Sequence, residues 1–97
     1  MTISNTTISQ NNANNGGGIY SLGYLTVEDS LITNNSAMCN GGGIYANHAY
    51  IFGCIINHNS APQGGGLFND YEAYVDHPTV IMNNTWNNIA GAPIIPA

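Results

Sequence analysis

Short stretches of alternating hydrophobic and polar residues, interrupted by polar turns, run along most of the chain. In one of them Leu25 and Val27 flank Thr26, and Ile32 follows Ser30 at the same spacing of two. This spacing is typical of β-strands, and no window shows the three-and-four spacing of an amphipathic helix. The pattern therefore predicts two or three short strands joined by turns, repeated along the chain.

The same pattern returns every 24 residues. Two aliphatic positions and one asparagine position keep this step through four repeats, and an alanine position keeps it through three before Thr85 takes the fourth place. These positions are occupied by Ile3, Val27, Ile51 and Val75; by Ile8, Ile32, Ile56 and Val80; by Asn11, Asn35, Asn59 and Asn83; and by Ala13, Ala37 and Ala61. A period in this range is typical of a stacked solenoid.

Stacking would place each residue over its equivalent one coil away, at the strand spacing of ~4.8 Å. The two aliphatic positions then form buried columns, whose removal from water is the main stabilising contribution. The asparagine position predicts a ladder, because an amide both donates and accepts hydrogen bonds and carries no charge to repel its neighbours. We expect one all-β domain, a parallel β-helix with repeats at about 1–20, 21–45, 46–68 and 69–88, and residues 89–97 as an irregular tail or a partial cap.

Glycine triplets occur at 16–18, 41–43 and 64–66, each followed by an aliphatic and an aromatic residue. Glycine suits corners that need a positive φ or a close approach of the backbone. A phosphate-binding P-loop would need a lysine after the glycines, and a dinucleotide-binding loop would need a helix. The triplets therefore predict corners of the coil.

The repeats resemble a known family. Ile8-Ser9-Gln10-Asn11 and Ile32-Thr33-Asn34-Asn35 are similar to the Phe-x-x-Asn element of the chlamydial polymorphic outer membrane protein repeat, and Gly42-Gly43-Ile44 resembles its Gly-Gly-Ala-Ile element without the alanine. They also resemble Asn-x-Ala…Gly-Gly-Gly-Ile-Tyr repeats of large bacterial and archaeal surface proteins. The resemblance implies a right-handed parallel β-helix at the cell surface, outer membrane or cell wall. It supplies no catalytic residues to carry over.

Composition excludes several functions. The chain has no lysine or arginine against five acidic residues, giving a formal net charge of −5. Nucleic-acid binding needs basic residues to neutralise phosphates, and attraction to anionic lipid needs them as well. No apolar run approaches the ~20 residues of a membrane span, so we expect no membrane insertion by this segment. The first residues lie inside a repeat and show no signal peptide, which suggests a fragment, an excised segment or a mature protomer.

Few side chains suggest chemistry. Glu28 and Asp76 are in register two coils apart, hence ~10 Å, which exceeds the spacing of a glycosidase carboxylate pair. His48 is in register with Glu72, but a zinc site needs three or four ligands. Cys39 and Cys54 fall at different places in the coil, too far apart to form a disulfide readily. We expect no catalytic residue, no metal and no cofactor.

The aromatic residues leave more open. Tyr20, Tyr45 and Phe68 should stack from coil to coil, and a second group lies in the variable turn before the next strand, comprising Tyr24, Tyr50, Tyr71 and Tyr74. This group could form a structural ladder or a surface that binds glycans. We therefore expect a non-enzymatic surface module, such as an adhesin passenger, stalk or fibre segment, whose partners are further coils or surface glycans. The alternatives are a filament subunit that stacks end to end on itself and a fragment of a carbohydrate-active enzyme.

Overall fold

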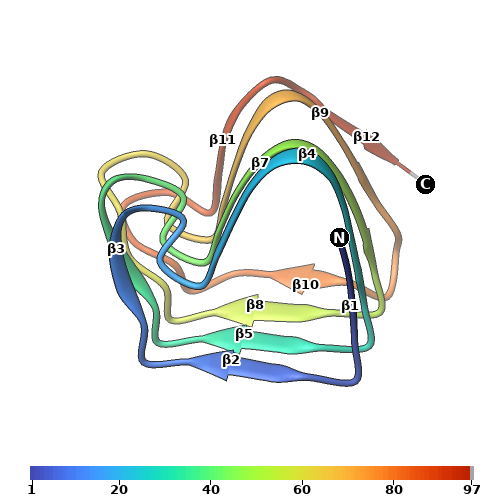
Figure 1. The fold of residues 1–97 in the computed structure, drawn as a ribbon, viewed down its shortest axis with the longest axis horizontal. Helices are drawn as coiled ribbons and strands as arrows, with labels where there is room; N and C mark the ends of the chain where they lie inside the picture. Colours follow the sequence, from blue (N-terminus) through green and yellow to red (C-terminus); the bar gives the residue numbers. More distant parts are fainter. Residues whose placement is uncertain (97) are drawn as a thin grey trace.

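The computed structural model describes residues 1–96, which form twelve strands joined by turns and bends (Figure 1). Ala97, the last residue of the predicted tail, lies outside the described residues. The strands β1 to β12 span Thr2–Ser4, Thr7–Ser9, Asn12–Asn15, Ile19–Glu28, Leu31–Thr33, Ser36–Asn40, Ile44–Phe52, Ile55–Asn57, Leu67–Val75, Val80–Ile81, Ile89–Gly91 and Ile94–Pro96.

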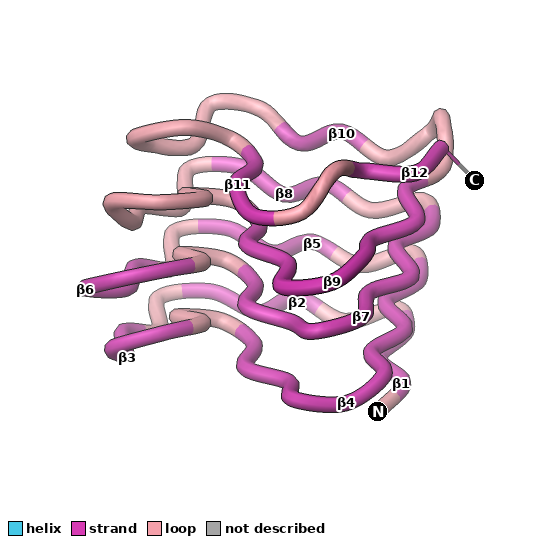
Figure 2. Tube along the Cα trace, turned by 90° about the horizontal axis from the view of Figure 1, so that it is seen from above, coloured by secondary structure: helices cyan, strands magenta, loops and turns pink. Residues whose placement is uncertain are grey.

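The strands form three sheets that run along the stack. The long sheet has the order β1-β4-β7-β9-β11, with β12 also paired to β9; the second has the order β10-β8-β5-β2; and the third pairs β3 with β6. Every strand pair is parallel. Figure 2 shows the coils lying one on another. The prediction of an all-β parallel solenoid of about four coils is therefore confirmed.

The register explains the period. Ile8 pairs with Ile32, which pairs with Ile56, each step covering 24 residues. The aliphatic position that begins at Ile3 is also in register, since Ile3 pairs with Val27, Val27 with Ile51 and Ile51 with Val75. The two middle members of this column are fully buried, and the two end members are partly buried against the core.

The fourth coil is shifted by one residue, so that three predicted positions, Val80, Asn83 and Thr85, are wrong. Ile56 pairs with Ile81, whereas Val80 pairs with Ile55 and is exposed. The corner before β10 contains one more residue than the corresponding corner after Ile51. Within this longer corner, the Thr79 N–H donates to the Asp76 carbonyl and carboxylate oxygens. The extra residue moves Val80 to the outer face and places Ile81 in the aliphatic column.

The asparagine ladder shows the same shift. The side-chain oxygens of Asn35 and Asn59 accept hydrogen bonds from the asparagine one coil below, as predicted. The next member is Asn84 and not Asn83, because the Asn59 N–H and Nδ2 donate to the Asn84 Oδ1 at 2.9 and 3.0 Å. Asn83 instead occupies a corner with φ of 59°. Similarly, Thr85 pairs with Ser60 and not with Ala61.

The glycine triplets form one corner in each of the first three coils. Gly16, Gly41 and Gly64 have φ between 62° and 68°, where a side chain is strained. The next glycine needs space: a Cβ at Gly42 would collide with the carbonyl oxygens of Ser60 and Gly65 in the coil above. The predicted role of the triplets at corners is confirmed.

Residues 89–96 are not irregular. Strand β11 pairs with β9 from Ile89 opposite Leu67, and β12 pairs with β9 from Ile94 opposite Ala73. Just before them, the Asn88 Oδ1 accepts hydrogen bonds from the Asn84 N–H and Nδ2 at 3.0 and 3.1 Å. The tail therefore extends the long sheet, and Asn88 accepts the hydrogen bonds of the last ladder asparagine.

Candidate functional site: the aromatic face

The outer surface of the long sheet carries every tyrosine and phenylalanine of the chain. All eight lie in β4, β7 and β9, at positions that alternate with buried residues such as Ile19, Leu25 and Ile44. None of the eight is buried, and Tyr20, Tyr24 and Tyr71 are exposed. We call this surface the aromatic face. Because the inner positions are filled by small and aliphatic side chains, the large rings project outward.

A register shift divides the aromatic face into two parts. Between Ala46 and His48, strand β7 has one residue fewer than β4 and β9 have at the same place. Such bulges bend a strand, and β4, β7 and β9 form an arch in Figure 1. The tyrosines that we expected in a turn therefore lie within continuous strands, at the register shift or after it.

The rings stack along the solenoid axis in three rows. Tyr20, Tyr45 and Phe68 form the first row, with ring centroids 5.1 and 5.3 Å apart. Tyr50 and Tyr74 form another, with ring centroids 5.0 Å apart and ring planes nearly parallel. The spacing follows from the coil spacing, since equivalent side chains of parallel strands lie about 4.8 Å apart.

The remaining row is mixed and was only partly foreseen. His48 stacks on Tyr24 at 4.6 Å and on Tyr71 at 5.3 Å. Its Nδ1 also lies 3.3 Å from the Glu72 carboxylate, as the sequence register predicted. His48 meets both Tyr71 and Glu72 because β9 contains the extra residue at the bulge. Sequence spacing alone gave only one of these two partners.

Two acidic residues of the aromatic face, Asp70 and Glu72, are bonded to neighbouring side chains. The Tyr45 hydroxyl donates to Asp70 at 2.6 Å, and this hydrogen bond is the main reason that the pKa of Tyr45 is raised to about 12. The charge of Glu72 raises the pKa of Tyr74, whose hydroxyl lies 3.4 Å from the carboxylate. These contacts occupy the carboxylates that could otherwise serve as acid or base.

The Asp76 carboxylate stabilises the corner next to the aromatic face. It accepts a 2.5 Å hydrogen bond from the Thr79 hydroxyl and others from the N–H groups of Thr79 and Gly53. The Thr79 hydroxyl is the main cause that lowers the pKa of Asp76. Asp76 is therefore a turn residue, and it does not act with Glu28 as a carboxylate pair.

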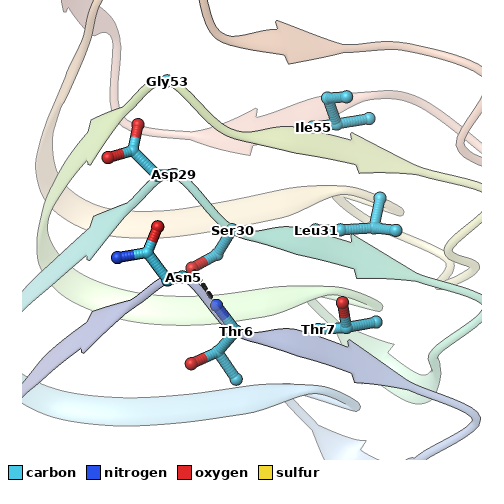
Figure 3. Close-up of a pocket in the computed structure, with 8 residues that line it drawn as sticks. All are labelled: Asn5, Thr6, Thr7, Asp29, Ser30, Leu31, Gly53 and Ile55. Atoms are coloured by element: carbon cyan, nitrogen blue, oxygen red, sulfur yellow. Dashed lines mark hydrogen bonds between the residues drawn. The ribbon is translucent and has the colours of Figure 1, made fainter.

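A shallow groove runs along the corner between the long sheet and the second sheet (Figure 3). One wall is polar, with Asn5 and Asp29 at positive φ and the Thr6 N–H donating to the Ser30 Oγ at 3.1 Å. The other wall carries the aliphatic side chains of Leu31 and Ile55. The groove has a single carboxylate, which is too few ligands for a cation site of its own.

Neither the cysteines nor the possible metal ligands form a site in residues 1–96. Cys39 is exposed and Cys54 is buried, and both are free thiols. Burial raises the pKa of the Cys54 thiol, as is typical of a structural cysteine in the core. In residues 1–96, no three His, Cys, Asp or Glu side chains come together as a metal site. Over the same residues, no helix is long and apolar enough to cross a membrane.

Comparison with known proteins identifies the repeat. Residues 5–22 and 29–47 match the family model of the Chlamydia polymorphic membrane protein repeat. Each matched segment runs from a corner through β2 or β5, past the ladder asparagine and the glycine triplet, into a long strand. Searches of the curated proteins and of the solved structures found no match. The first two coils therefore carry repeats similar to those of Chlamydia polymorphic membrane proteins, in a chain that folds as a parallel β-solenoid.

Proposed function

We propose that this chain is a non-enzymatic segment of a surface-exposed β-solenoid protein, working as a stalk or as part of an adhesin passenger. The match to a membrane-protein repeat over the first two coils is the observation that carries the proposal. The fold supports it, because the residues that repeat along the chain form the ladder, the corners and the core. The outer aromatic face is then the surface offered to other molecules.

The arrangement of polar groups also favours a structural role over an enzymatic one. Asp70, Glu72 and Asp76 are each held by a neighbouring hydroxyl or imidazole group. An enzyme that cleaves glycosidic bonds needs two carboxylates facing one substrate bond. This segment offers no such pair, so a carbohydrate-active enzyme would need to place its site elsewhere.

Surface location can be tested on the cells that produce the protein. Antibodies raised against the purified chain should label intact cells, and external protease should remove the signal. Trypsin should leave the segment uncut because it has no lysine or arginine, whereas proteinase K should cleave it. Labelling that appears only after the cells are permeabilised would contradict the proposal.

Glycan binding is a second candidate function at the ends of the aromatic rows. The inner faces of Tyr50 and Tyr74 cover each other, so this pair offers a sugar less ring surface than we expected. Tyr24 and Tyr71, which are 64% and 66% exposed, each stack on His48 by one face only. We expect any bound saccharide to be neutral, because the face carries acids and no cation.

A saccharide array can test this second candidate. Binding should be lost in the double variant Tyr24→Ser/Tyr71→Ser and kept in Trp86→Ser, which removes an exposed aromatic residue outside the aromatic face. Equal loss in both variants, or binding to acidic sugars alone, would argue against it.

A further inference from the structure

We propose that the two stacked tyrosine pairs of the aromatic face, Tyr20 with Tyr45 and Tyr50 with Tyr74, are sites of oxidative dityrosine cross-linking between consecutive coils. The oxidant is hydrogen peroxide, used by a peroxidase. The proposal does not depend on the surface role. It follows from the stacking of the rings, from two carboxylates that accept hydrogen bonds from phenol groups, and from the outward position of the side chains.

The register of the long sheet places tyrosine against tyrosine at two positions. Tyr20 is paired with Tyr45 through the backbone of β4 and β7, and Tyr50 is paired with Tyr74 through that of β7 and β9. The ring centroids of the two pairs lie 5.1 and 5.0 Å apart, with ring planes at 27° and 1° to each other. Coupling of the two rings therefore needs them to tilt toward each other, but it needs no change of register.

Each pair contains one tyrosine whose hydroxyl group donates to a carboxylate. The Tyr45 hydroxyl donates to Asp70 at 2.6 Å, and the Tyr74 hydroxyl donates to Glu72 at 3.4 Å. Because the pKa of Tyr45 is about 12, its hydroxyl group keeps the proton at neutral pH, and oxidation of the phenol to a radical must remove that proton. A carboxylate within hydrogen-bond reach is in position to accept it.

The reaction joins two tyrosyl radicals. The peroxidase takes one electron from each phenol, and each phenolic proton passes to the carboxylate or to water. A carbon–carbon bond then forms between the two ring positions beside the hydroxyl groups, and the hydrogen atom of each of these carbons moves to the phenolic oxygen, which restores the aromatic rings. The two electrons and two protons reduce hydrogen peroxide, so that two tyrosines and one peroxide give one dityrosine and two water molecules.

The rings of both pairs lie on the outer surface, where an oxidant can reach them. Tyr20 is 49% exposed, whereas Tyr45, Tyr50 and Tyr74 are half-buried. The pair of Tyr20 and Tyr45 has both the more exposed ring and the shorter hydrogen bond to a carboxylate. We therefore expect this pair to react first.

The third row of the aromatic face provides an internal control. His48 is stacked between Tyr24 and Tyr71, with ring centroids 4.6 and 5.3 Å from theirs. Tyr24 and Tyr71 are therefore held two coils apart, about 10 Å, although both are more exposed than Tyr20. If stacking and not exposure decides which tyrosines couple, these two form no link with each other.

Such links would join consecutive coils covalently. Both cysteines are free thiols, so no disulfide does this in residues 1–96. A bond between Tyr20 and Tyr45 closes a loop of about one coil, and it restricts the unfolded chain in the way that a disulfide does.

Oxidation of the purified full chain by a plant peroxidase and hydrogen peroxide tests the proposal. We expect a monomer that has lost two hydrogen atoms per link and shows dityrosine fluorescence. Mass spectrometry of its proteolytic fragments should join Tyr20 to Tyr45 and Tyr50 to Tyr74. The yield of links per chain should not change on dilution, because both partners belong to one chain.

Tyrosine-to-phenylalanine variants separate the two sites, since they keep the ring and remove the hydroxyl group. Tyr20→Phe should abolish the first link and keep the second, and Tyr50→Phe should do the reverse. The double variant Tyr24→Phe/Tyr71→Phe is the matched control and should form both links at the rate of the parent chain.

The variant Asp70→Asn tests the proton acceptor. The link between Tyr20 and Tyr45 should form severalfold more slowly in this variant, whereas the link between Tyr50 and Tyr74 should form at the parental rate. An unchanged rate for the first link would contradict the role of Asp70.

Two outcomes would overturn the proposal as a whole. One is a set of links that join different chains and disappear on dilution. The other is a pattern in which Tyr24 and Tyr71 are linked as often as the stacked pairs, because exposure and not stacking would then select the reacting residues.

Discussion

At the scale of single residues, the asparagine ladder shows how one side chain can satisfy several backbone groups. The Asn59 Nδ2 donates to the Ile32 carbonyl oxygen and to the Asn84 Oδ1, while its own Oδ1 accepts two hydrogen bonds from Asn35. Asn59 is 1% exposed. Buried polar groups are costly when unpaired, so a neutral amide that both donates and accepts is the suitable residue at this corner.

The shifted ladder gives a direct comparison of two adjacent residues. Asn84→Ala should lower the free energy of unfolding by about 3 kcal/mol, because it leaves two buried donors of Asn59 unpaired. Asn83→Gly should change it by less than about 0.5 kcal/mol, since Asn83 is an exposed corner residue at positive φ, which glycine adopts freely. Urea denaturation measures both values. A larger effect for Asn83 than for Asn84 would contradict the assigned ladder.

The Tyr45 hydroxyl provides a pH prediction. Its folded pKa of about 12 lies above the ordinary value, so the bond to Asp70 stabilises the fold below pH ~10 and this stabilisation is lost as the pH rises from ~10 through 12. Asp70→Asn should lower the pKa of Tyr45, which appears in the absorbance titration of tyrosinate. The same substitution in a Tyr45→Phe background should leave the titration of the other tyrosines unchanged; a shift there would contradict the assignment.

At the scale of elements, most strands were predictable because their determinants are local and repeat with a fixed step. Ile8, Ile32 and Ile56 were placed correctly by counting alone. Counting failed where a corner changed length: the Asp76–Thr79 corner is held by side-chain hydrogen bonds that have no counterpart in the other coils, so Val80 and Asn83 were misplaced. A Pro-containing corner was the available signal for this change.

The aromatic face was predictable in part. Stacking of Tyr20 on Tyr45 follows from the step between the glycine triplets. The pairing of His48 with both Tyr71 and Glu72 depends on a bulge, which the sequence does not mark. The position of a bulge depends on the packing of neighbouring strands. The period of the repeat does not show which strand has one residue more or fewer than its neighbours.

The corner glycines provide a prediction for one element. Gly42→Ala should lower the free energy of unfolding by about 3 kcal/mol, or prevent folding, because the added methyl group meets backbone oxygens that cannot move aside. Gly23→Ala is the matched control, since a Cβ there has no atom within 4 Å. It should be neutral or slightly stabilising. Thermal denaturation of the two variants measures the difference, and similar midpoints would contradict the role of close approach.

At the scale of the whole molecule, the solenoid has a direction. Five strands pair in succession at the position of Val27, namely β1, β4, β7, β9 and β12. The second sheet has only four strands. Two copies stacked head to tail would therefore bring β12 of one against β1 of the other and leave a gap of one coil beside the second sheet. A continuous filament of identical chains would have to fill this gap.

Residue-by-residue amide hydrogen exchange tests the central claim, that the coils form one continuous stack through which the asparagine ladder runs unbroken. The backbone N–H groups of Asn35, Asn59 and Asn84 each donate to the next ladder side chain. We predict that all three exchange at one slow rate, that of global unfolding. Three different rates, or exchange of the Asn59 N–H as fast as that of an unprotected amide, would contradict the account.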